Sequence, residues 1–162
     1  MKDKITIRRA KNKDIMDIVL QLKAFAEFTE VDYLYSNGTN AYDFVRQLID
    51  NHFVLVAAFP SETLEEKLSG IAGFIAGTVG PHYFNPEISV LSEILWWVTP
   101  KYRRSPAAKM LLDEFVEWGE TNCDWTLLSL DKNSPVNERA FLKRGFHLKE
   151  RVFLKESHGR CK

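Results

Sequence analysis

One segment near the middle of the chain constrains the fold most, because it reads as a strand, a helix and a second strand in succession. Glu93–Val98 is mostly apolar, as expected of a buried strand. Ser105 is a favourable N-cap residue, and Pro106 suits the first position of a helix, where its missing N–H costs nothing. We therefore predict a helix over 106–121 and a strand over 125–130. This order predicts a crossover between two parallel strands.

Apolar periodicity predicts the other elements. Side chains three and four positions apart predict a helix over 15–28, and the unbroken apolar run 53–59 is typical of a strand covered on both faces. In chain order the predicted elements are strand 5–10, helix 15–28, helix 41–51 capped by Asn40, strands 53–59, 68–79 and 93–98, helix 106–121, strand 125–130, helix 136–144 ended by Gly145, and a strand or strand pair within 146–155. Three early strands joined by short turns favour an antiparallel meander. The predicted fold class is α/β (α+β), a mixed sheet with helices on both faces.

Charge and composition limit the possible functions. The 162 residues include 22 basic and 22 acidic side chains, which argues against a dedicated nucleic-acid binder or a polybasic membrane module. No apolar run approaches the roughly 20 residues of a membrane span, and the N-terminus has no apolar core of signal-peptide length. Cys123 and Cys161 suggest no structural disulfide, and the histidines and cysteines show no metal-ligand spacing. We expect a single cytoplasmic domain over 1–156 and a polar tail over 157–162.

The turn that leads into the helix 106–121 is suited to an anion. The first N–H groups of a helix have no partner inside the helix, and the macrodipole places partial positive charge there. The small side chains of Ala107 and Ala108 let a bulky anion approach the backbone. The basic side chains around this helix start are Arg103, Arg104 and Lys109. The alternative is a well-capped helix with solvated basic residues.

The order of elements and several short motifs resemble the GNAT (Gcn5-related) N-acetyltransferase family over nearly the whole chain. Val98-Thr-Pro-Lys-Tyr-Arg103 matches the family's approach to an Arg/Gln-x-x-Gly-x-Gly/Ala loop, with Arg103 in the first motif position and Ala108 in the last. Phe141-Leu-Lys-Arg-Gly-Phe146 and Val152-Phe-Leu-Lys155 match the family's final helix and strand. The resemblance implies a GNAT-like mixed, mostly antiparallel sheet flanked by helices, with a splayed central strand pair.

The resemblance also implies acetyl-CoA as the cofactor. The backbone of the central strand would pair with the pantetheine arm as an added strand, and amides at the helix start would hold the pyrophosphate. Asn133 or Ser134, just past the second splayed strand, would contact the pantetheine or adenosine side. The residues that the resemblance assigns to the cofactor are Leu95, Trp97, Val98, Arg103, Arg104, Ser105, Ala107, Ala108, Lys109 and Asn133.

Glu93 is the candidate general base for direct transfer of the acetyl group to an amine. The same strand of the family often carries a catalytic glutamate. Strict alternation would place Glu93, Leu95 and Trp97 on one face of the strand. Desolvation beside a cleft would raise the pKa of the Glu93 carboxyl group. The alternative is an ordinary carboxylate at a strand edge.

Two positions depart from the family pattern. Pro106 stands where a glycine is usual and removes one N–H from the predicted cradle. Phe141 stands where many members have a tyrosine that acts as the general acid, and a phenylalanine cannot donate a proton. Both departures favour an alternative function, a non-catalytic module that keeps the fold and binds a ligand or a protein.

The acceptor would be a small-molecule or peptide amine, with no nucleic-acid or membrane partner. The loops 31–40 and 80–91 would select it. Their candidate side chains are the aromatic Tyr33, Tyr35, Tyr83 and Phe84 and the acidic Asp32 and Glu87. The family includes both monomers and homodimers, and both states stay open for this chain.

Overall fold

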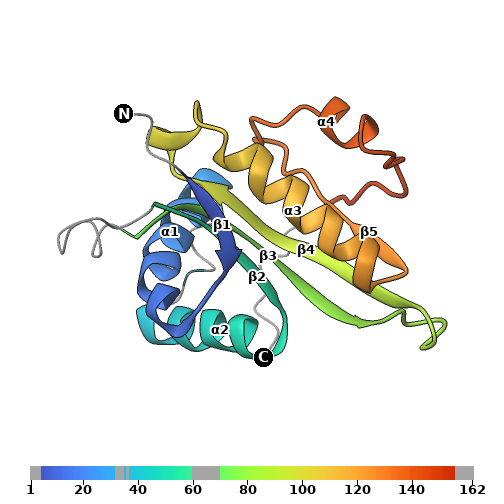
Figure 1. Cartoon of the computed structure of the whole chain (residues 1–162), viewed down its shortest axis with the longest axis horizontal. Helices are drawn as coiled ribbons and strands as arrows, with labels where there is room; N and C mark the ends of the chain where they lie inside the picture. Colours follow the sequence, from blue (N-terminus) through green and yellow to red (C-terminus); the bar gives the residue numbers. More distant parts are fainter. Residues whose placement is uncertain (1–4, 32–34, 36, 60–69, 156–162) are drawn as a thin grey trace.

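A five-stranded sheet lies between helices in the computed structural model, which describes residues 5–31, 35, 37–59 and 70–155 (Figure 1). In chain order the elements are β1 (Thr6–Arg9), the short 3-10 helix η1 (Asn12–Asp14), α1 (Ile15–Phe28), α2 (Gly38–Asn51), β2 (Phe53–Ala58), β3 (Ile71–Pro81), β4 (Ser89–Val98), the 3-10 helix η4 (Pro100–Tyr102), α3 (Ala107–Asn122), β5 (Trp125–Leu127) and α4 (Arg139–Leu142). Every helix within the described residues is too short or too polar to span a lipid bilayer.

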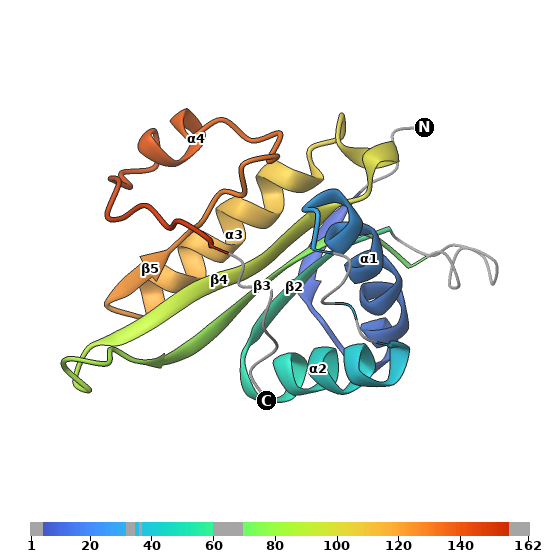
Figure 2. The same ribbon diagram turned by 180° about the vertical axis from the view of Figure 1, so that it is seen from behind.

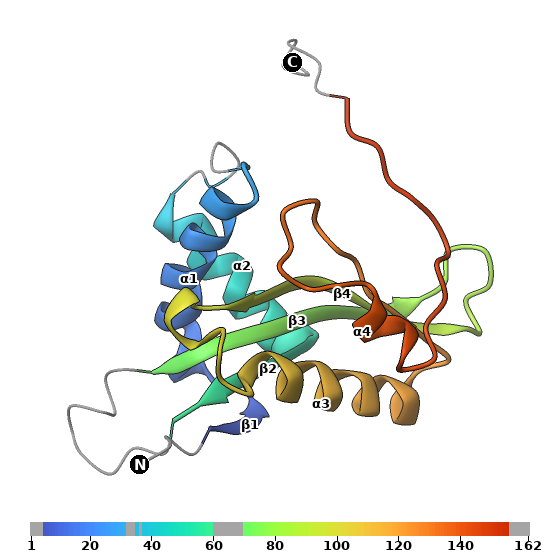
Figure 3. The ribbon, with the colours of Figure 1, turned by 90° about the horizontal axis from the view of Figure 1, so that it is seen from above.

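The sheet is mixed and mostly antiparallel, as predicted. Its strand order is β1-β2-β3-β4-β5, and the pairs from β1 to β4 are antiparallel. β5 runs parallel to β4, because α3 carries the chain back between them. Helices α1 and α2 cover one face of the sheet and α3 covers the other (Figure 3). Seen from either side, α4 lies at the opposite end of the molecule from α1 and α2 (Figure 2).

Strand β2 shows why the chain folds into these layers. All six of its residues are buried, as the unbroken apolar run predicts. Val54 and Val56 belong to the core cluster with α1 and α2, whereas Phe53 and Leu55 belong to the cluster with α3. Alternate side chains of one strand therefore fill the two halves of the core.

Two predicted boundaries in the first half of the chain are wrong. Helix α2 begins at Gly38 rather than at residue 41, because the side chain of Asn37, not of Asn40, caps it by accepting the N–H of Asn40 (2.9 Å). The β3–β4 hairpin is longer than predicted, since Pro81 still pairs with Ser89. A proline is tolerated at the end of a strand, so the Gly-Pro pair does not start the turn.

The last third of the chain has less regular structure than predicted. β5 ends at Leu127 instead of residue 130, and α4 has four residues within the predicted helix 136–144. Gly145, predicted to end this helix directly, comes three residues after its last residue, Leu142, and has a φ of 85°. No helix or strand is present over 146–155, where Val152, Phe153 and Leu154 are exposed. An alternating pattern alone does not make a strand when no sheet edge pairs with it.

Several predictions concern residues outside the described ranges. They are Asp32 and Tyr33 of the predicted acceptor loop, positions 68–69 of the predicted third strand, and the polar tail 157–162 with Cys161.

Gly73 is expected to be sensitive to substitution, because a Cβ atom there would lie 2.8 Å from the Val98 Cα and would also meet the Trp97 carbonyl oxygen. Backbone atoms of a paired strand cannot move aside cheaply. Gly73→Ala should therefore lower the free energy of unfolding by about 2–3 kcal/mol in a urea titration. Gly80→Ala, in the same strand with open space around the new methyl group, should change it by less than about 0.5 kcal/mol. Similar losses in both variants would contradict this explanation.

Candidate functional site

A cavity lies where β4 and β5 separate. The two strands pair only from Val90–Ser92 to Trp125–Leu127, and beyond Leu127 the chain leaves the sheet. The separation leaves the rest of the β4 edge open, which confirms the predicted splayed pair. A cavity of about 260 Å³ occupies the gap. It is lined by Phe25, Phe28 and Thr29 at the end of α1, Glu93, Ile94 and Trp96–Val98 of β4, Arg103 and Ala108 at the start of α3, and Ser129–Asp131 with Ser134–Val136 beyond β5.

The backbone of β4 directs alternate residues toward the open edge. The N–H of Thr99 donates to the carbonyl of Ala72 in β3 (2.9 Å). Because backbone groups alternate along an antiparallel strand, Leu95 and Trp97 also face β3, while Trp96 and Val98 face the cavity side. Val98 thus directs its backbone groups toward the cavity side, although its carbonyl already accepts a hydrogen bond from Arg103. Trp96 shares this orientation, whereas Leu95 and Trp97, predicted as cofactor contacts, direct their backbone groups toward β3.

A β-bulge interrupts β4 beside the cavity. Gly77 is the partner of Glu93 and Ala76 is the partner of Leu95, so Ile94 is an extra residue with no counterpart in β3. The prediction that strict alternation aligns Glu93, Leu95 and Trp97 on one face is therefore wrong, because a bulge resets the alternation. Nothing in the composition of β4 signals this bulge.

The carboxylate of Glu93 bridges the gap between the separating strands. Its Oε2 accepts hydrogen bonds from the Oγ (2.9 Å) and the backbone N–H (3.2 Å) of Ser129. Burial raises the pKa of Glu93 above its ordinary range, and the two hydrogen bonds from Ser129 oppose this shift only in part. A half-buried carboxylate with increased proton affinity therefore lines the cavity.

Helix α3 directs its N-terminal end toward the same cavity. The helix begins at Ala107, one residue later than predicted, with Pro106 as its N-cap. Ser105 accepts the N–H of Ala107 (3.3 Å) through its Oγ, which donates to the carbonyl of Tyr102 (2.6 Å). The amides of Ala108 and Lys109 follow in the first turn, where no helix carbonyl precedes them as a partner. Amides in this position are the kind of donor that an anion site requires.

The basic residues of this turn lie in different surroundings. Arg103 lines the cavity, whereas Arg104 is exposed. Lys109 forms an ion pair with Asp113 one turn along the helix. Of the three predicted cationic side chains, the structure thus brings only Arg103 into the cavity.

Arg103 is held by aromatic rings and a strand carbonyl. Its guanidinium group lies 4.8 Å from the ring centre of Phe28 and 4.7 Å from that of Trp97, and its Nε donates to the Val98 carbonyl (3.2 Å). The indole Nε1 of Trp97 is buried and has no hydrogen-bond partner among the described residues. Phe25 also packs edge-on against Trp97.

Asn133 connects the segment beyond β5 to α1. Its side-chain amide donates to the carbonyl of Phe28 (3.5 Å), and its backbone N–H donates to Asp131 (2.8 Å). Lys132 forms an ion pair with Glu30 (2.6 Å), just past the end of α1. Asn133 does not line the cavity, whereas Ser134, the other candidate, does.

Phe141, at the position of the family's usual acid, and the described acceptor candidates do not line the cavity. Phe141 is buried and stacks near Trp96, at a ring distance of 6.3 Å. Tyr83 and Phe84 are exposed in the loop of the β3–β4 hairpin, where they cluster with His82. The titratable side chains that line the cavity, within the described residues, are Glu93, Arg103 and Asp131. No described tyrosine or histidine lines it.

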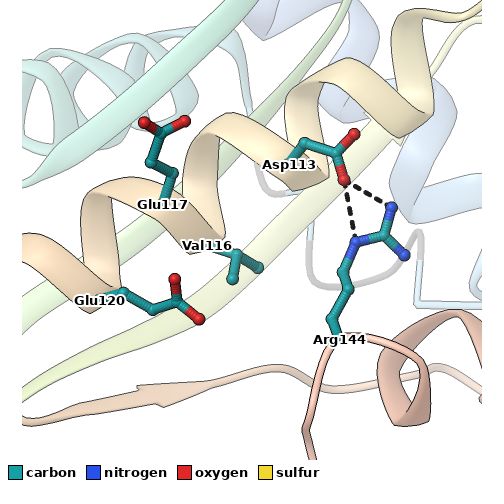
Figure 4. A pocket seen from close by; sticks show the side chains of 5 residues that line it. All are labelled: Asp113, Val116, Glu117, Glu120 and Arg144. Carbon is teal, nitrogen blue, oxygen red and sulfur yellow. Dashed lines mark hydrogen bonds and ion pairs between the residues drawn. The ribbon is translucent and has the colours of Figure 1, made fainter.

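A second, shallower pocket of about 270 Å³ lies on the outer side of α3 (Figure 4). The guanidinium group of Arg144 donates to Asp113 Oδ1 at 2.6 and 2.9 Å and thereby attaches the chain after α4 to α3. Glu117 and Glu120 complete the acidic wall. This pocket therefore lies at a contact that holds the chain after α4 against α3.

In the described residues, no group of three or more His, Cys, Asp or Glu side chains could hold a metal ion.

Solved structures share this architecture. A predicted acetyltransferase from Clostridium acetobutylicum, determined with acetyl-CoA, is 16% identical, with 96% of this chain and 100% of that chain covered at a TM-score of 0.69. An aminoglycoside N-acetyltransferase in complex with CoA is 15% identical, with 98% of each chain covered at a TM-score of 0.68. The chain has the acetyltransferase fold. A transcriptional regulator from Bacillus halodurans C-125 is also similar, at 17% identity, 95% and 100% coverage and a TM-score of 0.71.

Two comparisons made by sequence alone find no match to this chain. No family model matches the chain. No curated protein sequence matches it either. The resemblance noted in the sequence is thus confirmed for the fold, and a shared fold does not establish a shared activity.

Proposed function

We propose that this protein is an acetyl-CoA-dependent N-acetyltransferase that transfers the acetyl group directly to an amine. The observation that carries the proposal is the open edge of β4, which lies between the half-buried carboxylate of Glu93 and the N-terminus of α3. Similar structures determined with CoA or acetyl-CoA support the choice of cofactor.

The residues around the cavity suit a CoA molecule. Trp96 and Val98 offer backbone groups to an extended amide chain, as an added strand requires. The amides of Ala108 and Lys109 suit a diphosphate, since a helix N-terminus favours negative charge. Pro106 supplies no N–H, so this cradle has one donor fewer than a glycine would give. The cofactor supplies an acetyl group activated as a thioester.

Glu93 has the role of general base in this proposal. An ammonium group cannot attack, so the acceptor must lose a proton before or during the reaction. Burial raises the pKa of the Glu93 carboxyl group. A higher pKa makes a carboxylate a stronger base, and a general base is most effective when its pKa lies near the working pH. Ser129 orients the carboxylate through two hydrogen bonds. Phe141 is buried against Trp96 and cannot protonate the leaving thiolate, so Glu93 would hold the proton taken from the amine while CoA leaves as the thiolate.

A non-catalytic binding module is the second candidate. Pro106 in the predicted cradle and Phe141 in place of an acid favour it. Such a module would bind the cofactor or another ligand without turning it over. Binding and turnover must therefore be measured separately.

A thermal shift measurement tests the proposal. Acetyl-CoA at about 100 times its Kd should stabilise the folded protein by about 2.7 kcal/mol and raise Tm by roughly 5 °C or more. Ala108→Glu places a carboxylate at the cavity, where it should repel a diphosphate but favour the helix N-terminus. This variant should remain folded and lose the shift. Absence of any shift with the unchanged protein at millimolar acetyl-CoA would refute the proposal.

A further inference from the structure

The aromatic surroundings of Arg103 form a binding site for a positive charge. The rings of Phe28 and Trp97 both face its guanidinium group, at 4.8 and 4.7 Å. The face of an aromatic ring carries partial negative charge and attracts cations, and the attraction strengthens where water is excluded. Trp97 is only 5% exposed, so its face of the site is largely desolvated.

Further negative charge surrounds this aromatic site. Phe28 is the last residue of α1, so the site lies at the helix end that carries partial negative charge. Glu93 and Asp131 line the same cavity, and Arg103 is its only cationic side chain among the described residues. The site therefore favours a cation by its construction, and in this structure the chain's own arginine fills it.

The same arginine blocks part of the open strand edge. Its Nε donates to the carbonyl of Val98, one of the backbone groups that face the cavity. Arg103 also precedes by four residues the start of α3, where the amides of Ala108 and Lys109 lie, and it lines the cavity together with Ala108. An anion at these amides would attract the guanidinium group and form charge-assisted hydrogen bonds with it. Movement of Arg103 would then free both the Val98 carbonyl and the two rings.

We propose that the ring pair Phe28–Trp97 binds a cationic group of the acceptor, and that Arg103 occupies this site until a diphosphate at the start of α3 draws it away. This inference rests on the proposed acetyltransferase function. Because the nitrogen that is acetylated must be neutral when it attacks, the cation in the ring pair is a second charged group of the acceptor. The acceptor class is thus an amine that carries another ammonium or quaternary ammonium group.

The arrangement couples the two ligands. If the diphosphate ligand removes Arg103 from the rings, it strengthens the binding of the cation, and the cation strengthens the binding of the diphosphate ligand by the same factor. We expect each ligand to change the Kd of the other about tenfold, because the site binds a single cation between two partly desolvated rings.

Isothermal titration calorimetry with choline and CoA tests this coupling. Choline carries a quaternary ammonium group and has no amine to acetylate, and 3,3-dimethylbutan-1-ol is its neutral counterpart of the same shape. In the unchanged protein, saturating CoA should lower the Kd for choline about tenfold. In Arg103→Met, choline should bind about equally tightly with and without CoA. The neutral alcohol should bind weakly in every case.

The variant Arg103→Met with Phe28→Leu is the matched control. It should lose about tenfold in choline affinity relative to Arg103→Met alone, because one ring is removed. The Tm of each variant shows whether it is folded. Without CoA, equal choline affinity in the unchanged protein and Arg103→Met would overturn the inference, as would equal binding of choline and the alcohol by Arg103→Met. If CoA fails to bind the unchanged protein, the proposed function fails, while the choline affinities without CoA still decide whether the rings bind a cation.

Discussion

Glu93→Gln is expected to lower kcat for acetyl transfer by about 100-fold or more, while the affinity for acetyl-CoA changes little. A positioned general base contributes roughly 10²–10⁴ in rate, and glutamine cannot accept a proton from the amine. Glutamine has nearly the same shape and can still accept the hydrogen bonds from Ser129 through its amide oxygen. The loss should therefore appear in kcat, measured by steady-state kinetics, whereas calorimetry should give nearly the same Kd for acetyl-CoA in both proteins.

The pH dependence of kcat provides an independent readout. A general base works in its ionised form, so activity should fall as pH falls through the pKa of Glu93. Burial raises that pKa above the ordinary value of about 4.3 for glutamate, which moves this acid limb to higher pH. The limb should be absent from the residual activity of Glu93→Gln.

Glu87→Gln is the control for this substitution. Glu87 is an exposed carboxylate in the β3–β4 hairpin loop and does not line the cavity. Its variant should keep the kcat of the unchanged protein. If Glu93→Gln also keeps kcat within twofold, Glu93 has no part in the mechanism.

Asp14→Asn is expected to lower the free energy of unfolding by about 3 kcal/mol, because it breaks a buried ion pair. Asp14 is 3% exposed and accepts two hydrogen bonds from Arg8, at 2.7 and 2.8 Å. It also accepts the backbone N–H of Lys11 (2.8 Å). The carboxylate thus joins β1 to the start of α1. The substitution leaves the half-buried guanidinium group of Arg8 without its counter-charge.

The effect of Asp14→Asn should depend on pH in a defined direction. Burial acts to raise the pKa of Asp14, but the hydrogen bonds from Arg8 and Lys11, with the charges of Arg8 and Lys13, outweigh it and lower the pKa below its ordinary value. The ionised carboxylate therefore stabilises the fold above the unfolded-state pKa of about 3.9, and this contribution is lost as pH falls through the folded-state pKa. The difference between the two proteins should stay constant from pH 7 to about 5 and shrink below about 4.

Urea titrations of Asp43→Asn provide the comparison. Asp43 pairs with Arg46 at 3.3 Å on the surface of α2, where both side chains are about half exposed. Removing this pair should cost less than about 1 kcal/mol. A loss of stability in Asp14→Asn no larger than that in Asp43→Asn would show that the Arg8 pair is not important for the fold.

Long, strongly periodic elements were predictable from the sequence. The apolar spacing within Ile15–Phe28 and the unbroken run Phe53–Ala58 each match an observed element. Such patterns are local, because each side chain faces the core or the solvent according to its own position in the element. The predicted parallel pairing of β4 with β5 also holds, since α3 leaves few other ways to return the chain.

Short elements and side-chain partners were less predictable. β5 stops at Leu127 and no strand is present over 146–155, because a strand exists only where another strand edge pairs with it. Arg8 pairs with Asp14 six residues away, a partner that strand periodicity does not reveal. The bulge at Ile94 depends on the register between two strands, which no local pattern in β4 reveals.

The sequence by itself determined the order of the main elements, the start of α3 to within one residue and the resemblance on which the choice of cofactor rests. These features depend on local periodicity, capping and short motifs. Only the tertiary structure decided which groups share the cavity. It brings Glu93 to Ser129 across the gap between two strands and places Arg103 against Phe28, which is 75 residues distant along the chain. Such contacts arise from packing between elements, so the chemistry around the cavity depends on the folded arrangement.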